Sequence, residues 1–141
     1  MVRLMGIDYG DARIGIALSD LLGITAQGHS TLKNTHDETP FVEIQKIIKE
    51  NSVGKIVLGL PKNMDGSEGF RAEATYEFAE KLKGYTDLEI VFWDERLSTV
   101  AAHSYMNSLD IRGKKRKGIV DTIAAALILE NYMQKNSGGG F

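Results

Sequence analysis

Two apolar runs late in the chain constrain its fold most strongly. They are "KIVLGLP" at 55–61 and "LEIVFW" at 88–93, and each contains few polar residues. A strand with one face in water alternates polar and apolar residues, whereas a strand covered by helices on both faces is continuously apolar, as in parallel sheets. Apolar residues at helical spacing lie between the two runs and predict a connecting helix: Phe70, Ala74, Phe78, Ala79 and Leu82. The sequence therefore predicts an α/β fold.

The first half of the chain predicts an antiparallel meander followed by a helix. Residues 2–8 and 13–19 are β-prone and are separated by the turn sequence "YGDA", which favours a hairpin. A third strand is expected near 24–33, and apolar spacing predicts a helix from Thr39 to about Ser52. With the two later strands, we expect a central mixed five-stranded sheet flanked by helices.

The last third of the chain predicts two helices joined by a basic loop. Ser98 or Thr99 is suited to cap the first helix, which is expected to end near Leu109. The loop "IRGKKRKG" follows, and the apolar stretch "IAAALIL" belongs to a final helix at 119–134. Residues 135–141, with three glycines, are expected to form a flexible tail.

Length and composition predict one domain, residues 1–141, with no signal peptide and no membrane span, and hence a cytoplasmic protein. The absence of cysteine excludes disulfides, thiolate metal sites and cysteine nucleophiles. A net charge of -2 argues against a uniformly basic nucleic-acid binder. However, a basic cluster lies within six positions: Arg112, Lys114, Lys115, Arg116 and Lys117.

Acidic residues stand where predicted elements begin or end. Asp8 lies at the end of the first strand, and Asp121 opens the last helix beside the basic loop. Asp94 and Glu95 follow "IVFW", where the last strand stops. Parallel strands end at one edge of a sheet, and ligands collect there. Because the "KIVLGLP" strand is expected between the other two, Asp8 and Glu95 converge in this prediction, and Asp121 can join them.

Three clustered carboxylates require a compensating positive charge. At about 5 Å and an effective dielectric near 20, each pair repels by roughly 3 kcal/mol, so three pairs approach the stability of a typical domain. Oxygen ligands without cysteine suit Mg²⁺ or Mn²⁺. Two such ions, roughly 3.5 to 4 Å apart, can activate a water and stabilise the leaving oxygen of a phosphodiester. The pattern thus predicts a two-metal site that hydrolyses nucleic acid.

Each acid also has a purely structural interpretation. Asp8 and Asp94 are in positions where turn formers are common, and Asp121 favours the dipole of its own helix. Glu95 can be solvated or paired with Arg96. These interpretations explain each residue singly but do not require their joint placement at matched ends of elements, which favours the metal site.

Two further segments are candidates for substrate contact. The basic loop can bind phosphates that flank the scissile bond, or it can be a solvated connector. "NMDGSEG" can present backbone N–H groups and Ser67 to a phosphate, or it can be an ordinary connection between strand and helix. It is not a Walker A sequence, because no Gly-Lys-Ser/Thr follows at the required spacing.

Four blocks, in this order, resemble the YqgF family: "GIDYGDARIGIA", "GLPKNMDGSEG", "WDERLST" and "KRKGIVDTIAAALIL". The resemblance covers nearly the whole chain. It implies a ribonuclease H-like three-layer fold and a metal-dependent nuclease related to Holliday junction resolvases. Family members are described as nucleases that process the 5′ end of pre-16S ribosomal RNA.

The resemblance also assigns roles to residues of this chain. The acids of the family motifs fall on Asp8, Glu95 and Asp121, which become the expected catalytic residues and metal ligands. Matching positions imply supporting or substrate-contacting roles for five further residues: Arg13, Asp65, Ser67, Arg96 and Lys117. With the basic loop, the expected substrate-binding set is Arg13, Ser67, Arg96, Lys114, Lys115, Arg116 and Lys117.

The function we expect is hydrolysis of phosphodiester bonds in structured nucleic acid, preferably pre-16S ribosomal RNA, with two Mg²⁺ or Mn²⁺ ions held by Asp8 as the bridging ligand and by Glu95 and Asp121. One alternative is a resolvase acting on branched DNA; two symmetric cuts favour a dimer, whereas trimming of RNA requires one site and a monomer. A second is a non-catalytic ribosome assembly factor. A third, an actin-like ATPase or sugar kinase, needs two domains, for which 141 residues are too few.

Overall fold

The computed structural model describes residues 2–63, 65–94 and 113–140, with side chains placed in 2–63, 65–94 and 121–135. The elements in these residues are β1 (Arg3–Tyr9), β2 (Arg13–Ser19), β3 (Ala26–Lys33), α1 (Thr39–Glu50), β4 (Val53–Leu60), α2 (Phe70–Leu82), β5 (Ile90–Asp94) and α4 (Gly113–Gly140). The predicted strands and the predicted helices at α1 and α2 are all present. The helix expected from Ser98 or Thr99 to Leu109 lies outside the described residues.

The sheet has five strands in the order β3-β2-β1-β4-β5. β1 pairs antiparallel with β2, and β2 with β3, so the first three strands form the predicted meander. β4 pairs parallel with β1 on one side and with β5 on the other. The carboxyl ends of β1, β4 and β5 therefore meet at one edge of the sheet, as their apolar sequences predicted.

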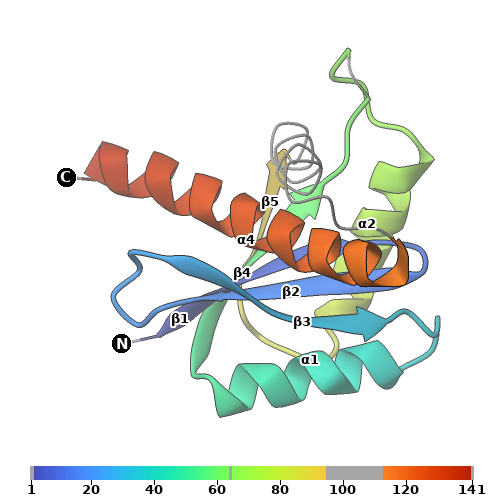
Figure 1. Ribbon diagram of the computed structural model, residues 1–141, viewed down its shortest axis with the longest axis horizontal. Coiled ribbons are helices and arrows are strands. Elements are labelled where there is room, and N and C mark those ends of the chain that lie inside the picture. The colour runs from blue at the N-terminus through green and yellow to red at the C-terminus, as the bar shows by residue number, and fades with distance from the viewer. Residues whose placement is uncertain (1, 64, 95–112, 141) are drawn as a thin grey trace.

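The helices lie in two layers, one on each face of the sheet. Figure 1 shows α4 running across one face, while α1 and α2 lie on the other. Buried side chains of α1 and α2 pack with buried strand residues in one cluster, on what we call the α1/α2 face. On the opposite face, the α4 face, α4 packs on β1, β2 and β3. This is the three-layer α/β arrangement expected from the sequence. Within the described residues, no helix is both long and apolar enough to cross a membrane.

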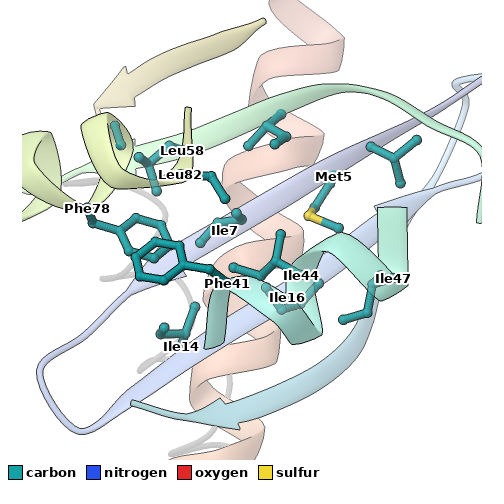
Figure 2. Close-up of a cluster of buried hydrophobic side chains, with 13 residues drawn as sticks. Met5, Ile7, Ile14, Ile16, Phe41, Ile44, Ile47, Leu58, Phe78 and Leu82 are labelled. Atoms are coloured by element: carbon teal, nitrogen blue, oxygen red, sulfur yellow. The ribbon is translucent and has the colours of Figure 1, made fainter. Parts of the chain in front are cut away.

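The α1/α2 face is filled by large apolar side chains. The strands contribute Met5, Ile7, Ile14, Ile16 and Leu58 to the cluster drawn in Figure 2, and the helices contribute Phe41, Ile44, Ile47, Phe78 and Leu82. The rings of Phe41 and Phe78 stack with their centroids 5.3 Å apart. Strand side chains alternate between the two faces, so every second residue of β1 and β2 enters this cluster and its neighbours face α4.

The α4 face is built from small residues where the helix crosses β1, β2 and β3. A Cβ added to Gly6 would lie 2.7 Å from the carbonyl oxygen of Ala125, and one added to Gly28 would lie 2.9 Å from the Cβ of Thr122. A Cβ on Gly15 would collide with the carbonyl oxygen of Asp121. Because these positions carry no side chain, the backbone of α4 approaches the sheet closely.

The boundaries of α4 differ from the prediction. The helix was expected at 119–134 but extends over Gly113–Gly140, so the residues assigned to a basic loop from Gly113 onward are helical. Lysine and arginine are good helix formers, and no proline interrupts them, so the basic run continues the helix. At its other end, α4 continues through 135–140, which were expected to form the tail; glycine has a low helix propensity, and no local feature of the sequence predicts this extension.

Candidate active site

Asp8 lies near the carboxyl end of β1, on the face of the sheet that α4 covers. Met5 and Ile7 point into the α1/α2 cluster, whereas Leu4 packs with the residues under α4. Alternation along the strand therefore turns Asp8 toward α4. Its partner across the β1–β2 hairpin is Gly15, and Asp8 itself is only half-buried. A carboxylate at this place keeps access to water while it faces the helix.

Asp121 reaches the same place from α4. Its main chain lies directly over Gly15, where an added Cβ would collide with the Asp121 carbonyl oxygen and lie 3.1 Å from the Asp121 Cβ. Since Gly15 is also the register partner of Asp8, the two acids share one neighbour although 113 positions separate them in sequence. The structure thus brings Asp8 and Asp121 to one edge and one face of the sheet.

Arg13 contributes a positive charge to this edge. It lies on β2 two residues before Gly15, so its side chain is on the α4 face. Its Nε donates a hydrogen bond to Oδ2 of Asp121 over 2.7 Å, and the two groups form an ion pair. The Arg13 side chain is 38% exposed and that of Asp121 17%, so the pair is partly shielded from solvent screening.

The third predicted acid, Glu95, and its neighbour Arg96 lie outside the described residues. Asp94, the last residue of β5, is described; Trp93 packs with the residues under α4, so alternation turns Asp94 to the opposite face from Asp8. Among the described residues, no three His, Asp or Glu side chains gather closely enough to hold a metal ion. The structure therefore places two of the three predicted metal ligands together.

The predicted substrate-binding lysines and arginine of the basic cluster lie in the first turns of α4: Lys114, Lys115, Arg116 and Lys117. They precede Asp121 on the same helix, and their side chains are not among those described. A helix rises about 1.5 Å per residue, so this segment begins roughly 10 Å from Asp121 along the axis. The basic run and the acid are consequently parts of one element, where the prediction had a loop beside a helix.

Ser67 lies in the connection between β4 and α2, at the same edge of the sheet. Its hydroxyl donates to Oδ1 of Asp65 over 2.6 Å and lies 2.9 Å from Nδ2 of Asn63, which donates to it. The Ser67 backbone N–H also donates to Asp65, and Gly66 has a φ of +89°, as a tight turn requires. In this arrangement Asp65 and Ser67 stabilise the loop through each other.

A cavity of about 480 Å³ opens on the other face, between α1 and α2 beside Tyr9. Its lining carries four carboxylates, Asp11, Asp37, Glu38 and Glu77. Lys81 is the lysine in the same lining, and His36 contacts Asp11. The excess of negative charge in this lining repels anions such as phosphate.

Gly15 is a site-forming residue that the sequence analysis did not identify. It contributes no chemical group, but only a residue without Cβ allows Asp121 to lie against β2 opposite Asp8. A signal was present, because an isolated glycine within a strand pattern such as "RIGIALS" indicates close approach of another backbone. That signal does not say which segment approaches.

Comparisons with known proteins agree with these features. The family model described as "RuvX: Holliday junction resolvase" matches residues 2–135. A protein of Ruminiclostridium cellulolyticum named "Putative pre-16S rRNA nuclease" is 47% identical over 138 residues, covering 97% of each chain. A protein of the same name from Clostridioides difficile is also 47% identical, over 93% of each chain.

Solved structures show the same fold at low sequence identity. The RuvC structure of Thermus thermophilus superposes with a TM-score of 0.59 at 10% identity and covers 97% of both chains. RuvC of the same organism in complex with a Holliday junction substrate gives a TM-score of 0.55 at 9% identity, covering 98% of this chain and 97% of RuvC. The predicted ribonuclease H-like fold is thereby confirmed. The expected kind of enzyme, a nuclease that hydrolyses phosphodiester bonds, is confirmed by the family and the names of its members, and the chain belongs to the RuvX family, the YqgF family that its motifs resemble.

Proposed function

We propose that this protein is a metal-dependent nuclease that hydrolyses phosphodiester bonds in structured RNA and processes the 5′ end of pre-16S ribosomal RNA. One observation carries the proposal: Asp8 is the register partner of Gly15, and Asp121 lies over Gly15 on the same face, at the edge of the sheet where parallel strands end. The relatives named as pre-16S rRNA nucleases match over nearly the full chain and favour RNA as the substrate.

The donor set at this edge fits a hard divalent cation. Asp8 and Asp121 offer carboxylate oxygens, and the chain contains no cysteine, so Mg²⁺ or Mn²⁺ is favoured over softer metals. The close approach of α4 over Gly15, the register partner of Asp8, supports a shared site for the two carboxylates. In this proposal Asp8 is the central ligand, and Glu95 and Asp121 complete the set.

When bound, two such ions supply Lewis-acid chemistry, activating a water on one side of the scissile phosphate and stabilising the leaving oxygen on the other. The protein positions the carboxylates and the substrate. Lys114, Lys115, Arg116 and Lys117 lie at the start of α4, where cationic side chains attract the phosphates that flank the site. Arg13, Ser67 and Arg96 are proposed as additional substrate contacts.

The proposal is tested by incubating the purified protein with a pre-16S RNA precursor and, in parallel, with a four-way DNA junction, each with Mg²⁺, Mn²⁺ or a chelator. We expect cleavage near the 5′ end of the RNA that needs a divalent cation. Asp8→Asn combined with Asp121→Asn is expected to lower the rate by at least about a hundredfold, the size typical for loss of one electrostatic stabiliser.

Asp87→Asn is the matched control, because Asp87 is an exposed carboxylate just before β5, at the opposite edge of the sheet from Asp8. It is expected to cleave like the wild type. Cleavage by the double variant at the wild-type rate, with its fold intact by circular dichroism, would contradict the proposed site.

A second candidate is a resolvase of branched DNA. It is favoured by the description of the family and by the structural likeness to RuvC, which was solved with a Holliday junction. The DNA arm of the same experiment decides between them: symmetric cutting of the junction at a higher kcat/KM than for the RNA would make branched DNA the substrate. A third candidate, an assembly factor without catalysis, predicts that cells carrying Asp8→Asn process their ribosomal RNA normally.

We further propose that residues 1–141 form a single nuclease domain that acts as a monomer in the cytoplasm, because one site suffices to trim one RNA end. Sedimentation equilibrium of the purified protein at micromolar concentration checks the oligomeric state. A dimer would favour the resolvase, which must cut two symmetric strands.

A further inference from the structure

Arg13 stands in an unusual position for a residue expected only to bind substrate, because it is already bonded to a proposed metal ligand. Its Nε donates to Oδ2 of Asp121 over 2.7 Å, and the bond joins β2 to α4 across 108 positions of sequence. The contact engages one edge of the guanidinium. Among the described residues, the contact joins Nε of Arg13 to Oδ2 of Asp121 and does not involve the terminal nitrogens of the guanidinium.

The charges at this edge explain why a cation is needed there before any metal arrives. Asp8 and Asp121 share Gly15 as a neighbour on one face of the sheet, and the Asp121 side chain is largely removed from water. Repulsion between such groups destabilises the fold unless a positive charge is present. Arg13 supplies that charge without closing the site, because its side chain remains 38% exposed.

The same charge opposes the binding of a divalent cation. A guanidinium bonded to Asp121 repels an incoming ion and occupies an oxygen that the ion requires. A phosphate can remove this obstacle, because arginine binds phosphate oxygens through two parallel hydrogen bonds, and the contact with Asp121 uses only Nε of this partly exposed side chain. Arrival of the substrate would then transfer Arg13 from Asp121 to the phosphate and leave the carboxylate to the ion.

We propose, resting on the nuclease function above, that Arg13 is an exchange residue: it is the counterion of Asp121 in the free protein and moves to a substrate phosphate when RNA binds, which leaves Asp121 to the cation. Substrate and cation thereby promote each other's binding. By thermodynamic linkage, the factor by which RNA raises cation affinity equals the factor by which the cation raises RNA affinity.

The test uses Arg13→Gln, which keeps a polar side chain but removes the charge. Mn²⁺ binding is titrated by the electron paramagnetic resonance of free Mn²⁺, with and without a phosphorothioate RNA that resists cleavage. In the absence of RNA, we expect the variant to bind Mn²⁺ about tenfold more tightly than the wild type, in line with the effect of one nearby charge. In the absence of metal, we expect it to bind RNA more weakly, with the salt dependence reduced by about one phosphate contact.

Tighter Mn²⁺ binding together with weaker RNA binding in Arg13→Gln distinguishes the exchange from a purely structural or a purely phosphate-binding role. A residue that only holds Asp121 in place predicts weaker Mn²⁺ binding in Arg13→Gln, and one that only binds phosphate predicts unchanged Mn²⁺ binding; either result overturns the proposal. Arg13→Lys, which retains the charge, is expected to restore Mn²⁺ affinity to within about twofold of the wild type. Arg71→Gln, an exposed arginine on α2, is the control and should leave both titrations unchanged.

A measurement on the wild type keeps the proposal testable even if Arg13→Gln does not fold. The ¹⁵N resonance of Arg13 Nε–H reports its hydrogen bond, and it should shift when Mg²⁺ and the phosphorothioate RNA are added together. An unchanged resonance overturns the exchange. If neither the wild type nor the variant takes up Mn²⁺ with or without RNA, the metal-dependent function fails together with the inference. If the wild type binds Mn²⁺ and cleaves RNA, but Arg13→Gln does not combine tighter Mn²⁺ binding with weaker RNA binding, only the inference fails.

Discussion

Where α4 crosses β1, β2 and β3, the two faces of the sheet are packed differently. On the α1/α2 face, large side chains fill the space between sheet and helices, and eight of them are completely buried: Met5, Ile7, Ile14, Ile16, Ile44, Ile56, Leu58 and Leu82. On the α4 face, Gly6, Gly15 and Gly28 let the helix backbone touch the strands. Large side chains stabilise the domain but hold the helices farther from the sheet. Glycine contacts bury less apolar area, but they let the backbone of α4 lie against the strands that carry Asp8 and Arg13.

This comparison predicts that substitutions on one face mainly affect stability, whereas substitutions on the other mainly affect activity. Substitutions on the α1/α2 face should lower the free energy of unfolding while the folded molecules remain active. Substitutions at the glycines under α4 should impair activity more than their cost in stability suggests, because they move Asp121 relative to Asp8.

The largest effect on stability is expected for Ile44→Ala, on α1. Ile44 is fully buried, and truncation of such a residue costs about 2–5 kcal/mol through lost burial and the cavity left behind. Urea unfolding measures the loss, and cleavage assays well below the melting temperature should give a rate within about twofold of the wild type. A parallel loss of activity in the folded variant would show that the two faces are coupled.

The next effect is that of Gly15→Ala. The added Cβ collides with the main chain of Asp121, so α4 must move away, at a cost of about 1–3 kcal/mol in the free energy of unfolding. Cleavage is expected to fall by more than about tenfold, because displacement of a catalytic group by 1 Å can cost a hundredfold in rate. Mn²⁺ titration should show weaker binding.

Gly23→Ala is the matched control for this change. Gly23 has a φ of +71° in the β2–β3 connection, and nothing lies within 4 Å of an added Cβ. The variant is expected to lose roughly 1 kcal/mol through backbone strain but to keep its activity. Equal activity losses in both glycine variants would refute the special role of Gly15.

A smaller effect is expected for Gly28→Ala, on β3. Its Cβ would lie 2.9 Å from the Cβ of Thr122, a side-chain contact that can relax more readily than the collision at Gly15. We expect a loss of about 1 kcal/mol, at the low end for overpacking, and less than tenfold lower activity. Thermal unfolding and the cleavage assay, run in parallel with Gly15→Ala, measure whether the losses of stability and activity decrease with distance from Asp121.

The smallest effect concerns the middle of α4 and is visible only at high pH. Lys55 on β4 donates to the hydroxyl of Tyr132 over 3.3 Å and lies 3.4 Å from Glu89. The hydrogen bond to Tyr132, followed by electrostatic attraction, raises the pKa of Lys55 above its ordinary value of 10.5. Because the folded pKa is the higher one, this stabilisation is complete below the unfolded pKa and is lost as pH rises through the folded pKa.

The free energy of unfolding of Lys55→Met should therefore fall less at high pH than that of the wild type. The difference should be less than about 1 kcal/mol, because the Lys55 side chain is one-third exposed and screened by solvent. Melting temperatures recorded between about pH 9 and 12 measure it. Lys46→Met, an exposed lysine on α1, is the control. Identical alkaline profiles for wild type and Lys55→Met would contradict the link between β4 and α4.

Individual elements show which parts of the fold the sequence patterns predicted correctly. The continuous apolar runs predicted β4 and β5 as covered parallel strands, and the register of β4 with both neighbours confirms it. The basic run from Lys114 to Lys117 was assigned to a loop because charge runs often are connectors, yet these residues are helical. Glycines inside β1, β2 and β3 are a signal of close approach that the prediction did not use, and nothing in the linear pattern names α4 as the element that approaches.

The amino-acid sequence by itself determined the five strands and their order, helices α1 and α2, the oxygen-only chemistry of the acids and the family motifs, because propensity, periodicity and composition are local properties of the chain. Only the tertiary structure decided that Asp121 lies over Gly15 opposite Asp8 and that Arg13 is bonded to Asp121. Those contacts join residues more than 100 positions apart, and their distances depend on how closely a helix can approach a sheet, which the packing of the whole domain sets.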